Sequence, residues 1–131
     1  MRTVLLTAAF LSVSLGAPRI ELPEAGANPY IRLTHVIKNG TLHVTARNIS
    51  KKPILAYVVA VETDGQAMTH HDYFTGRDAF APGKTIELVF AVPSTSGAPK
   101  VFVDYVRLSD ASTSGALATD DAKDVAASFK D

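Results

Sequence analysis

The residues best able to do chemistry lie together in the segment Met68-Thr69-His70-His71-Asp72. Thioether, imidazole and carboxylate groups can together hold copper or zinc, so Met68, His70, His71 and Asp72 form one candidate metal site. Consecutive strand residues point to opposite faces, so both histidines could bind one ion only if the segment were a loop. The alternative is a solvated edge strand, with no metal and no cofactor.

Other catalytic chemistry has little support. The chain contains no cysteine, which excludes disulfides, thiolate catalysis and cysteine-type zinc sites. The Gly-x-Ser-x-Gly pattern of many hydrolases is absent, and carboxylates such as Glu62 and Asp64 lie near predicted turns. The 13 basic residues are balanced by 13 acidic ones, so nucleic-acid binding has no electrostatic support. We therefore expect neither an enzyme nor a nucleic-acid-binding protein.

Three aromatic residues, Tyr57, Tyr73 and Phe74, are candidates for contact with a partner protein. Exposed aromatic side chains on a sheet often anchor such partners. Packing in the core is the alternative interpretation. A fourth candidate, His35, falls on the apolar face of its predicted strand. It is either a buried ligand or base, or a core histidine bonded to a backbone carbonyl.

The N-terminus has the pattern of a signal peptide over residues 1–16. Arg2 supplies the positive charge, Val4 to Leu15 supply the apolar stretch, and Ala17 follows a small residue. The apolar stretch is shorter than the roughly 20 residues of a membrane-spanning helix. An uncleaved anchor or a buried first helix is the alternative. We expect a linker over residues 17–29 and export to the periplasm or beyond, with no membrane span after cleavage.

Alternating residues predict strands that must position these candidates. Asn39-Gly40 fits a two-residue hairpin turn between residues 30–38 and 41–48, which sets Lys38 opposite Thr41 and Leu33 opposite Ala46. The apolar run Ile54–Val61 predicts a central strand covered on both faces.

Further turn signals define the remaining strands. Asp64-Gly65 predicts a second hairpin, leading to a polar edge strand over 66–74. Ala81-Pro82-Gly83-Lys84 fits a type II turn before the alternating strand 85–92. The strand 101–108 has an ambiguous inward face, with alternate residues of both phases apolar. Six or seven short strands joined by turns predict an antiparallel β-sandwich over residues 30–109.

The last segment, residues 110–131, predicts a loop followed by a short helix. Thr119 can cap that helix, and acidic residues at 120 and 121 favour its first turn. Ala122, Val125, Ala126 and Phe129 then fall on one helical stripe. We expect this stripe to dock on the sandwich; recruitment of a partner is the alternative.

The order of these signals resembles bacterial exported immunoglobulin-like domains of the CARDB and FxLYD types. The resemblance rests on the residues Val44–Ser50, Lys52-Pro53-Ile54, Asp64-Gly65 and Ala81–Lys84, although the FxLYD tetrapeptide itself is absent. It implies an immunoglobulin-like fold and a non-enzymatic interaction or structural module of the cell envelope whose ligand is unknown. Another envelope protein is the partner we expect. The alternative function is a small periplasmic protein that binds copper or zinc through the His70-His71 region.

Overall fold

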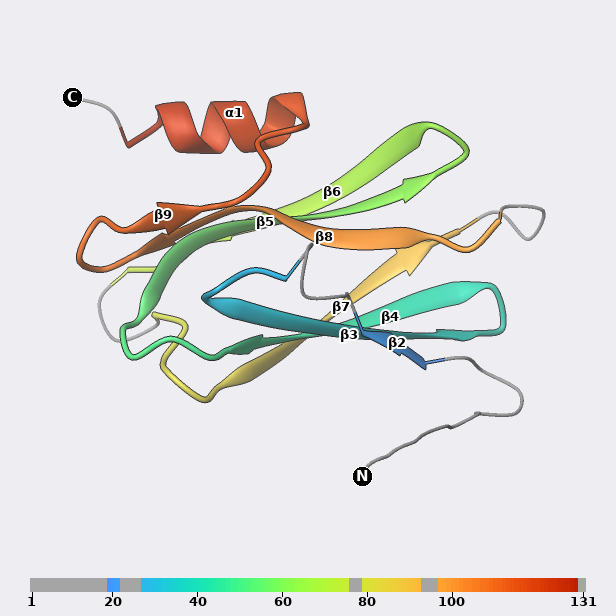
Figure 1. The fold of residues 1–131 in the computed structure, drawn as a ribbon, viewed down its shortest axis with the longest axis horizontal. Helices are drawn as coiled ribbons and strands as arrows, with labels where there is room; N and C mark the ends of the chain where they lie inside the picture. Colours follow the sequence, from blue (N-terminus) through green and yellow to red (C-terminus); the bar gives the residue numbers. More distant parts are fainter. Residues whose placement is uncertain (1–18, 22–26, 76–78, 93–96, 130–131) are drawn as a thin grey trace.

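The computed structural model describes residues 19–21, 27–75, 79–92 and 97–129. Its strands form two four-stranded antiparallel sheets, ordered β2-β3-β4-β7 and β6-β5-β8-β9, and a helix lies over the second sheet (Figure 1). The predicted all-β sandwich with a C-terminal helix is confirmed. The elements are β2 (Arg19–Glu21), β3 (Ile31–Lys38), β4 (Thr41–Asn48), β5 (Ile54–Thr63), β6 (Gln66–Tyr73), β7 (Thr85–Ala91), β8 (Lys100–Leu108), β9 (Thr113–Ser114) and α1 (Asp120–Ala127).

The strand order is that of an immunoglobulin-like sandwich. Counted from β3, the first, second and fifth strands share one sheet, and the third, fourth, sixth and seventh share the other. Strands A, B and E are separated from C, C′, F and G in the same way in immunoglobulin-like domains. The second sheet therefore has β6 and β9 at its edges and β5 and β8 at its centre.

Two short strands fall where the sequence predicts none. β2 lies inside the predicted linker and pairs with β3, and β9 lies in the predicted C-terminal loop and pairs with β8. Backbone pairing needs no apolar alternation, so segments of two or three residues carry no periodic signal. The predicted signal peptide, residues 1–16, lies outside the described residues.

Both hairpin turns have the predicted backbone. Asn39 and Gly40 have φ of 52° and 76°, and Asp64 and Gly65 have φ of 50° and 79°. Positive φ at both central residues is the mark of the two-residue turn that matches strand twist. The predicted pairing of Lys38 with Thr41 across the first turn is confirmed.

The main core lies between the sheets, and a second cluster lies beneath α1. β5 contributes to both clusters, as predicted for a strand covered on both faces. Leu88 and Phe90 point inward, whereas Glu87 and Val89 are exposed, so the alternation predicted for strand 85–92 is confirmed.

A β-bulge resolves the ambiguous face of β8. Val58 of β5 pairs with Tyr105, and the next residue, Val59, pairs with Val103, so Asp104 is the extra residue. Before the bulge Val101 and Val103 point into the main core, and after it Val106 and Leu108 do so. Both phases of the sequence are therefore inward, each on one side of the bulge.

The helix α1 begins and docks as predicted. The side chain of Thr119 accepts a hydrogen bond from the backbone N–H of Ala122 at 3.1 Å, which satisfies one free donor of the first turn. Ala122 and Val125 are buried against Ala56, Val58 and Tyr105. The C-terminal stripe therefore covers the outer face of the second sheet.

Candidate binding site

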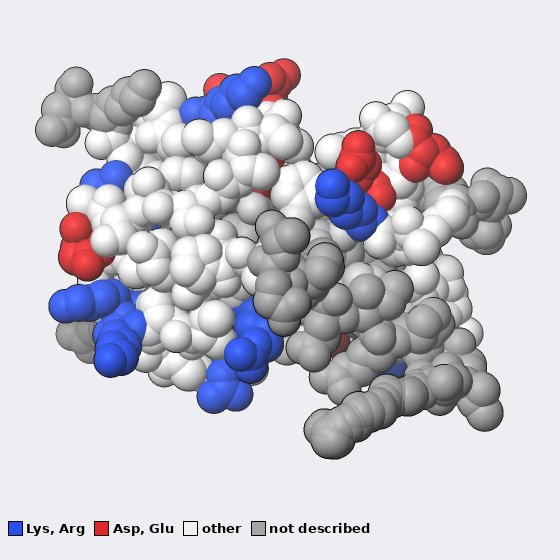
Figure 2. All heavy atoms as spheres, viewed as in Figure 1, with Lys and Arg blue, Asp and Glu red and all other residues white. Residues whose placement is uncertain are grey.

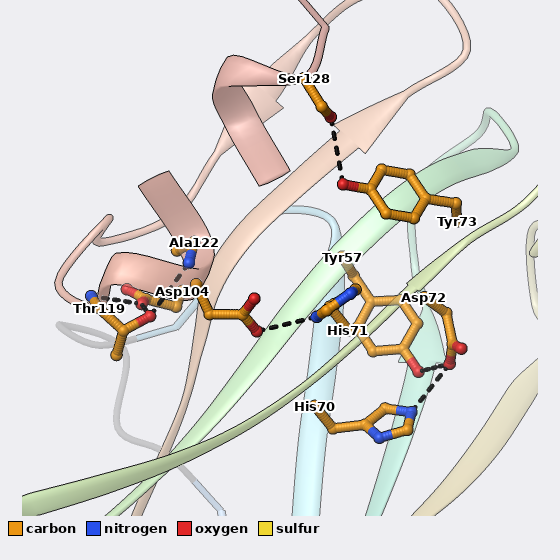
Figure 3. A network of polar contacts seen from close by, with 10 residues as sticks. Tyr57, His70, His71, Asp72, Tyr73, Asp104, Thr119, Ala122 and Ser128 are labelled. Carbon is orange, nitrogen blue, oxygen red and sulfur yellow. Dashed lines mark hydrogen bonds and ion pairs between the residues drawn. The ribbon is translucent and has the colours of Figure 1, made fainter. Parts of the chain in front are cut away.

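The predicted metal segment is β6, an edge strand, and its histidines are held apart. His70 Nε2 lies 3.0 Å from Asp72 Oδ2, and Asp72 also accepts a hydrogen bond from the hydroxyl of Tyr57 at 2.5 Å. His71 instead lies beside the helix, with Nδ1 at 2.9 Å from Asp121 Oδ2 (Figure 3). Each imidazole therefore has a carboxylate partner of its own.

The four-residue metal set is not brought together. Met68 packs against the main core, and His70 and His71 lie on opposite faces of β6. The described residues contain no group of three histidine, cysteine, aspartate or glutamate side chains that could hold an ion. Consecutive residues of a strand point to opposite faces, and this alternation keeps the side chains of His70 and His71 apart.

The three candidate aromatic residues divide between core and surface. Tyr57 is fully buried, and Phe74 stacks on it with ring centroids 5.9 Å apart. Burial, with a smaller contribution from Asp72, raises the pKa of Tyr57 far above its ordinary value, so this hydroxyl is a neutral donor. Tyr73 is half exposed but lies against Phe129, at 6.0 Å between centroids. Partner contact is therefore not the role of Tyr57.

These contacts fasten α1 to the sheet beneath it. At the helix start His71 meets Asp121, and at its end the Tyr73 hydroxyl lies 3.2 Å from Ser128 Oγ. The guanidinium group of Arg107 in β8 stands 4.5 Å from the centre of the Phe129 ring. Polar residues of β6, which is an edge strand of this sheet, thus hold the helix on the sheet.

The bulge residue Asp104 is a buried carboxylate that sequence reasoning missed. It accepts hydrogen bonds from the backbone N–H groups of Ala118 and Thr119, at 2.7 and 2.8 Å, and from Thr119 Oγ1 at 2.6 Å. The bulge turns this side chain away from the main core towards the loop before α1 (Figure 3). A charged residue within an apolar strand was its only signal in the sequence.

Gly115 brings the same loop close to β8. A Cβ atom at this position would lie 2.4 Å from the carbonyl oxygen of Asp104, so a side chain would collide with backbone. The N–H of Leu117 donates to that same oxygen at 2.9 Å. The loop is therefore held to β8 through both the backbone and the side chain of Asp104.

A pocket of about 580 Å³ opens between this loop and β8. It is lined by Glu62 of β5, Lys100 and Phe102 of β8, Asn28, and the loop residues Ser114, Gly115, Ala116, Ala118 and Thr119. Lys100 is the direct neighbour of Glu62 across the ladder, and its ammonium group lies 5.7 Å from the Phe102 ring centre. The pocket thus presents a cation, an anion and an aromatic face.

The pocket exists because β9 is short. β9 pairs only with Val106 and Arg107, and beyond it the loop contacts β8 only as far as Asp104. Within the described residues, the edge of β8 from Lys100 to Val103 has no strand on that side. Backbone groups along such an edge are free to pair with an added extended segment.

His35 is a core histidine. The hydrogen bond to a backbone carbonyl predicted for such a residue is not made by its Nε2 atom. The residue is 4% exposed, and among the described residues its Nε2 atom has no hydrogen-bond partner. Burial lowers the pKa of His35 below its ordinary value, so the ring is neutral at pH 7. His35 is not among the residues that line the pocket beside β8.

Comparison with known proteins adds no assignment. No protein-family model, curated protein or solved structure matches this chain. The resemblance to CARDB and FxLYD domains therefore stays a prediction. Among the described residues, no helix combines the length and apolar character needed to cross a membrane.

Proposed function

We propose that this protein is an exported, non-enzymatic immunoglobulin-like binding module of the cell envelope, and that the pocket beside β8 is its ligand site. The observation that carries the proposal is the pocket itself. Its volume of about 580 Å³ is within the usual range for ligand sites, roughly 300–1,000 Å³. It also combines apolar lining with a small number of polar groups, as such sites do.

The chemistry of the pocket favours an extended peptide. Among the described residues the edge of β8 from Lys100 to Val103 is unpaired, and such an edge offers backbone donors and acceptors in the arrangement by which a sheet accepts another strand. Phe102 supplies a flat apolar contact for a side chain of that peptide, and Glu62 and Lys100 supply one charge of each sign. A segment of another envelope protein would provide all three complementary features.

The remaining polar groups support a binding role rather than a catalytic one. His71 and Asp104 are engaged in contacts that fasten α1 and its loop, and His70 is paired with Asp72. Of these groups, Asp104 holds the loop that lines the pocket, through Ala118 and Thr119. The alternative, a copper or zinc carrier, has no observation in its favour because its two histidines lie on opposite faces of β6.

The peptide site is tested with isotope-labelled protein. Hexapeptides selected from a random display library are titrated in, and amide shifts are followed by NMR. We expect the largest shifts along Lys100–Val103, and at least tenfold weaker binding for Phe102→Ala. Val89→Ala is the matched control, because it removes an apolar side chain that is 60% exposed on the other sheet. Shifts confined to other surfaces, or equal binding by both variants, would refute the site.

Export is tested separately on the intact gene product. N-terminal sequencing of protein from the periplasmic fraction is expected to begin near Ala17. A sequence beginning at Met1, or protein found only in the cytoplasm, would contradict export without bearing on the peptide site. Titration with copper and zinc, comparing the protein with His70→Ala, tests the metal alternative.

A further inference from the structure

Two arginines lie side by side on the outer face of the other sheet, away from the pocket beside β8. Arg32 of β3 and Arg47 of β4 are directly paired in the ladder. Their neighbours Leu33 and Ala46 point into the core, so both arginines point outward, and both are exposed. Directly paired residues have Cβ atoms about 5 Å apart, so the two guanidinium groups can reach one small ligand.

Two like charges in this position need a compensating partner. Like charges directly opposite each other destabilise a sheet. Among the described residues, neither arginine forms an ion pair with a carboxylate. The ion pairs found there join a histidine to an aspartate or a glutamate. The two side chains border a hollow of about 430 Å³ that no acidic residue lines. Its lining is Arg32, Arg47, Asn48, Ile49, Ser50 and Gly83.

The floor of this hollow is fixed by Asn48. The buried Asn48 amide donates to the carbonyl oxygens of Lys52 at 2.9 Å and Phe80 at 2.8 Å, and its oxygen accepts from the N–H of Ser50 at 2.8 Å. Its backbone carbonyl accepts from the N–H of Gly83 at 2.8 Å. A rigid floor lowers the entropy that ligand binding would cost.

We propose that Arg32 and Arg47 together bind a phosphoryl group. Each guanidinium group presents parallel N–H donors that match two oxygens of such a group, and a tetrahedral oxyanion has enough oxygens for both arginines. Lys51 and Lys84 are also exposed at this end of the sandwich. Figure 2 shows several Lys and Arg side chains over the end where β3 begins, with acidic side chains beside them.

The proposal is tested by NMR titration with inorganic phosphate at constant ionic strength, with chloride as the balancing anion. The probe is the Nε–Hε signals of Arg32 and Arg47, which are expected to shift and saturate. Arg47→Gln is expected to weaken binding about tenfold or more, because a charge-assisted bidentate contact is lost. Arg47→Lys is expected to weaken it less, since a point charge remains without the fork. Lys38→Gln is the matched control, an exposed cation at the other end of β3.

A second arm identifies the source of the phosphoryl group. Vesicles of phosphatidylglycerol are mixed with the protein, and sedimentation measures the bound fraction for the native chain, Arg32→Gln/Arg47→Gln and Lys38→Gln. If the protein binds phosphate but not the vesicles, and the arginine variants lose that binding, the ligand is a soluble phosphate ester. If the protein also binds the vesicles and the arginine variants do not, the ligand is a lipid headgroup. Unsaturable shifts with phosphate, or equal losses in the arginine variants and in Lys38→Gln, would overturn the proposal. Thermal melting of each variant verifies that it is folded.

Discussion

Removal of the Asp104 carboxylate is expected to destabilise the protein strongly. The side chain is fully buried and accepts three hydrogen bonds, from Ala118 N, Thr119 N and Thr119 Oγ1. In Asp104→Ala these donors lose their acceptor, and each buried unsatisfied donor costs about 1–3 kcal/mol. Solvent can reach part of the loop, so we expect a total loss of about 3–5 kcal/mol. That is a large share of the roughly 5–15 kcal/mol available to a domain.

Urea denaturation followed by circular dichroism measures this loss. With a slope of about 1–3 kcal/mol per molar urea, the midpoint of Asp104→Ala should fall by about 1 M or more. Asp104→Asn keeps the volume and one acceptor oxygen, so its loss should be smaller. The amide nitrogen cannot accept from Thr119, so the loss should still be measurable.

The matched control is Asp124→Asn, which removes a charge from an exposed position of α1. Its free energy of unfolding should change by about 0.5 kcal/mol or less. Equal midpoints for Asp104→Ala and Asp124→Asn would refute the reasoning, because the three hydrogen bonds would then contribute nothing. A second readout is the amide signal of Thr119, which should lose protection from hydrogen exchange in Asp104→Ala alone.

Three further predictions concern the core and the first hairpin. Phe90→Ala should cost about 3–5 kcal/mol by opening a cavity between the sheets, whereas Glu87→Ala on the outer face should cost about 0.5 kcal/mol or less; similar urea midpoints would show that the inward face is misassigned. Gly40→Val should cost about 1–2 kcal/mol because φ is 76° there, and an unchanged melting temperature would contradict that strain. Burial lowers the pKa of His35 below its ordinary value of 6.5. At pH values below 6.5, His35 therefore binds a proton more readily in the unfolded chain than in the folded protein. Stability measured by urea midpoints should therefore fall as pH drops below 6.5, and His35→Gln should flatten that slope; identical pH profiles for the native protein and His35→Gln would exclude His35 as the cause.

The sequence by itself determined the sandwich and most of its turns. Asn39-Gly40 and Asp64-Gly65 specify positive φ locally, and a period of two places residues such as Leu88 and Phe90 on one face. The helix at residues 120–127 was also predictable, because its cap at Thr119 and its apolar stripe are local signals. Each of these features depends on neighbours within a few residues.

Only the tertiary structure decided where the polar residues act. The bulge at Asp104 arises because β5 and β8 pair with unequal numbers of residues, and the residue pattern of β8 alone does not reveal this. The bulge explains why residues of both phases of 101–108 point inward. The separation of His70 from His71 followed from strand alternation, but the partner of His71 is a helix residue 50 positions away. The pocket beside β8 and the hollow at Arg32 and Arg47 likewise join segments distant in sequence. Such sites depend on strand pairing and on where a strand ends, and short strands and bulges leave almost no periodic signal in a sequence.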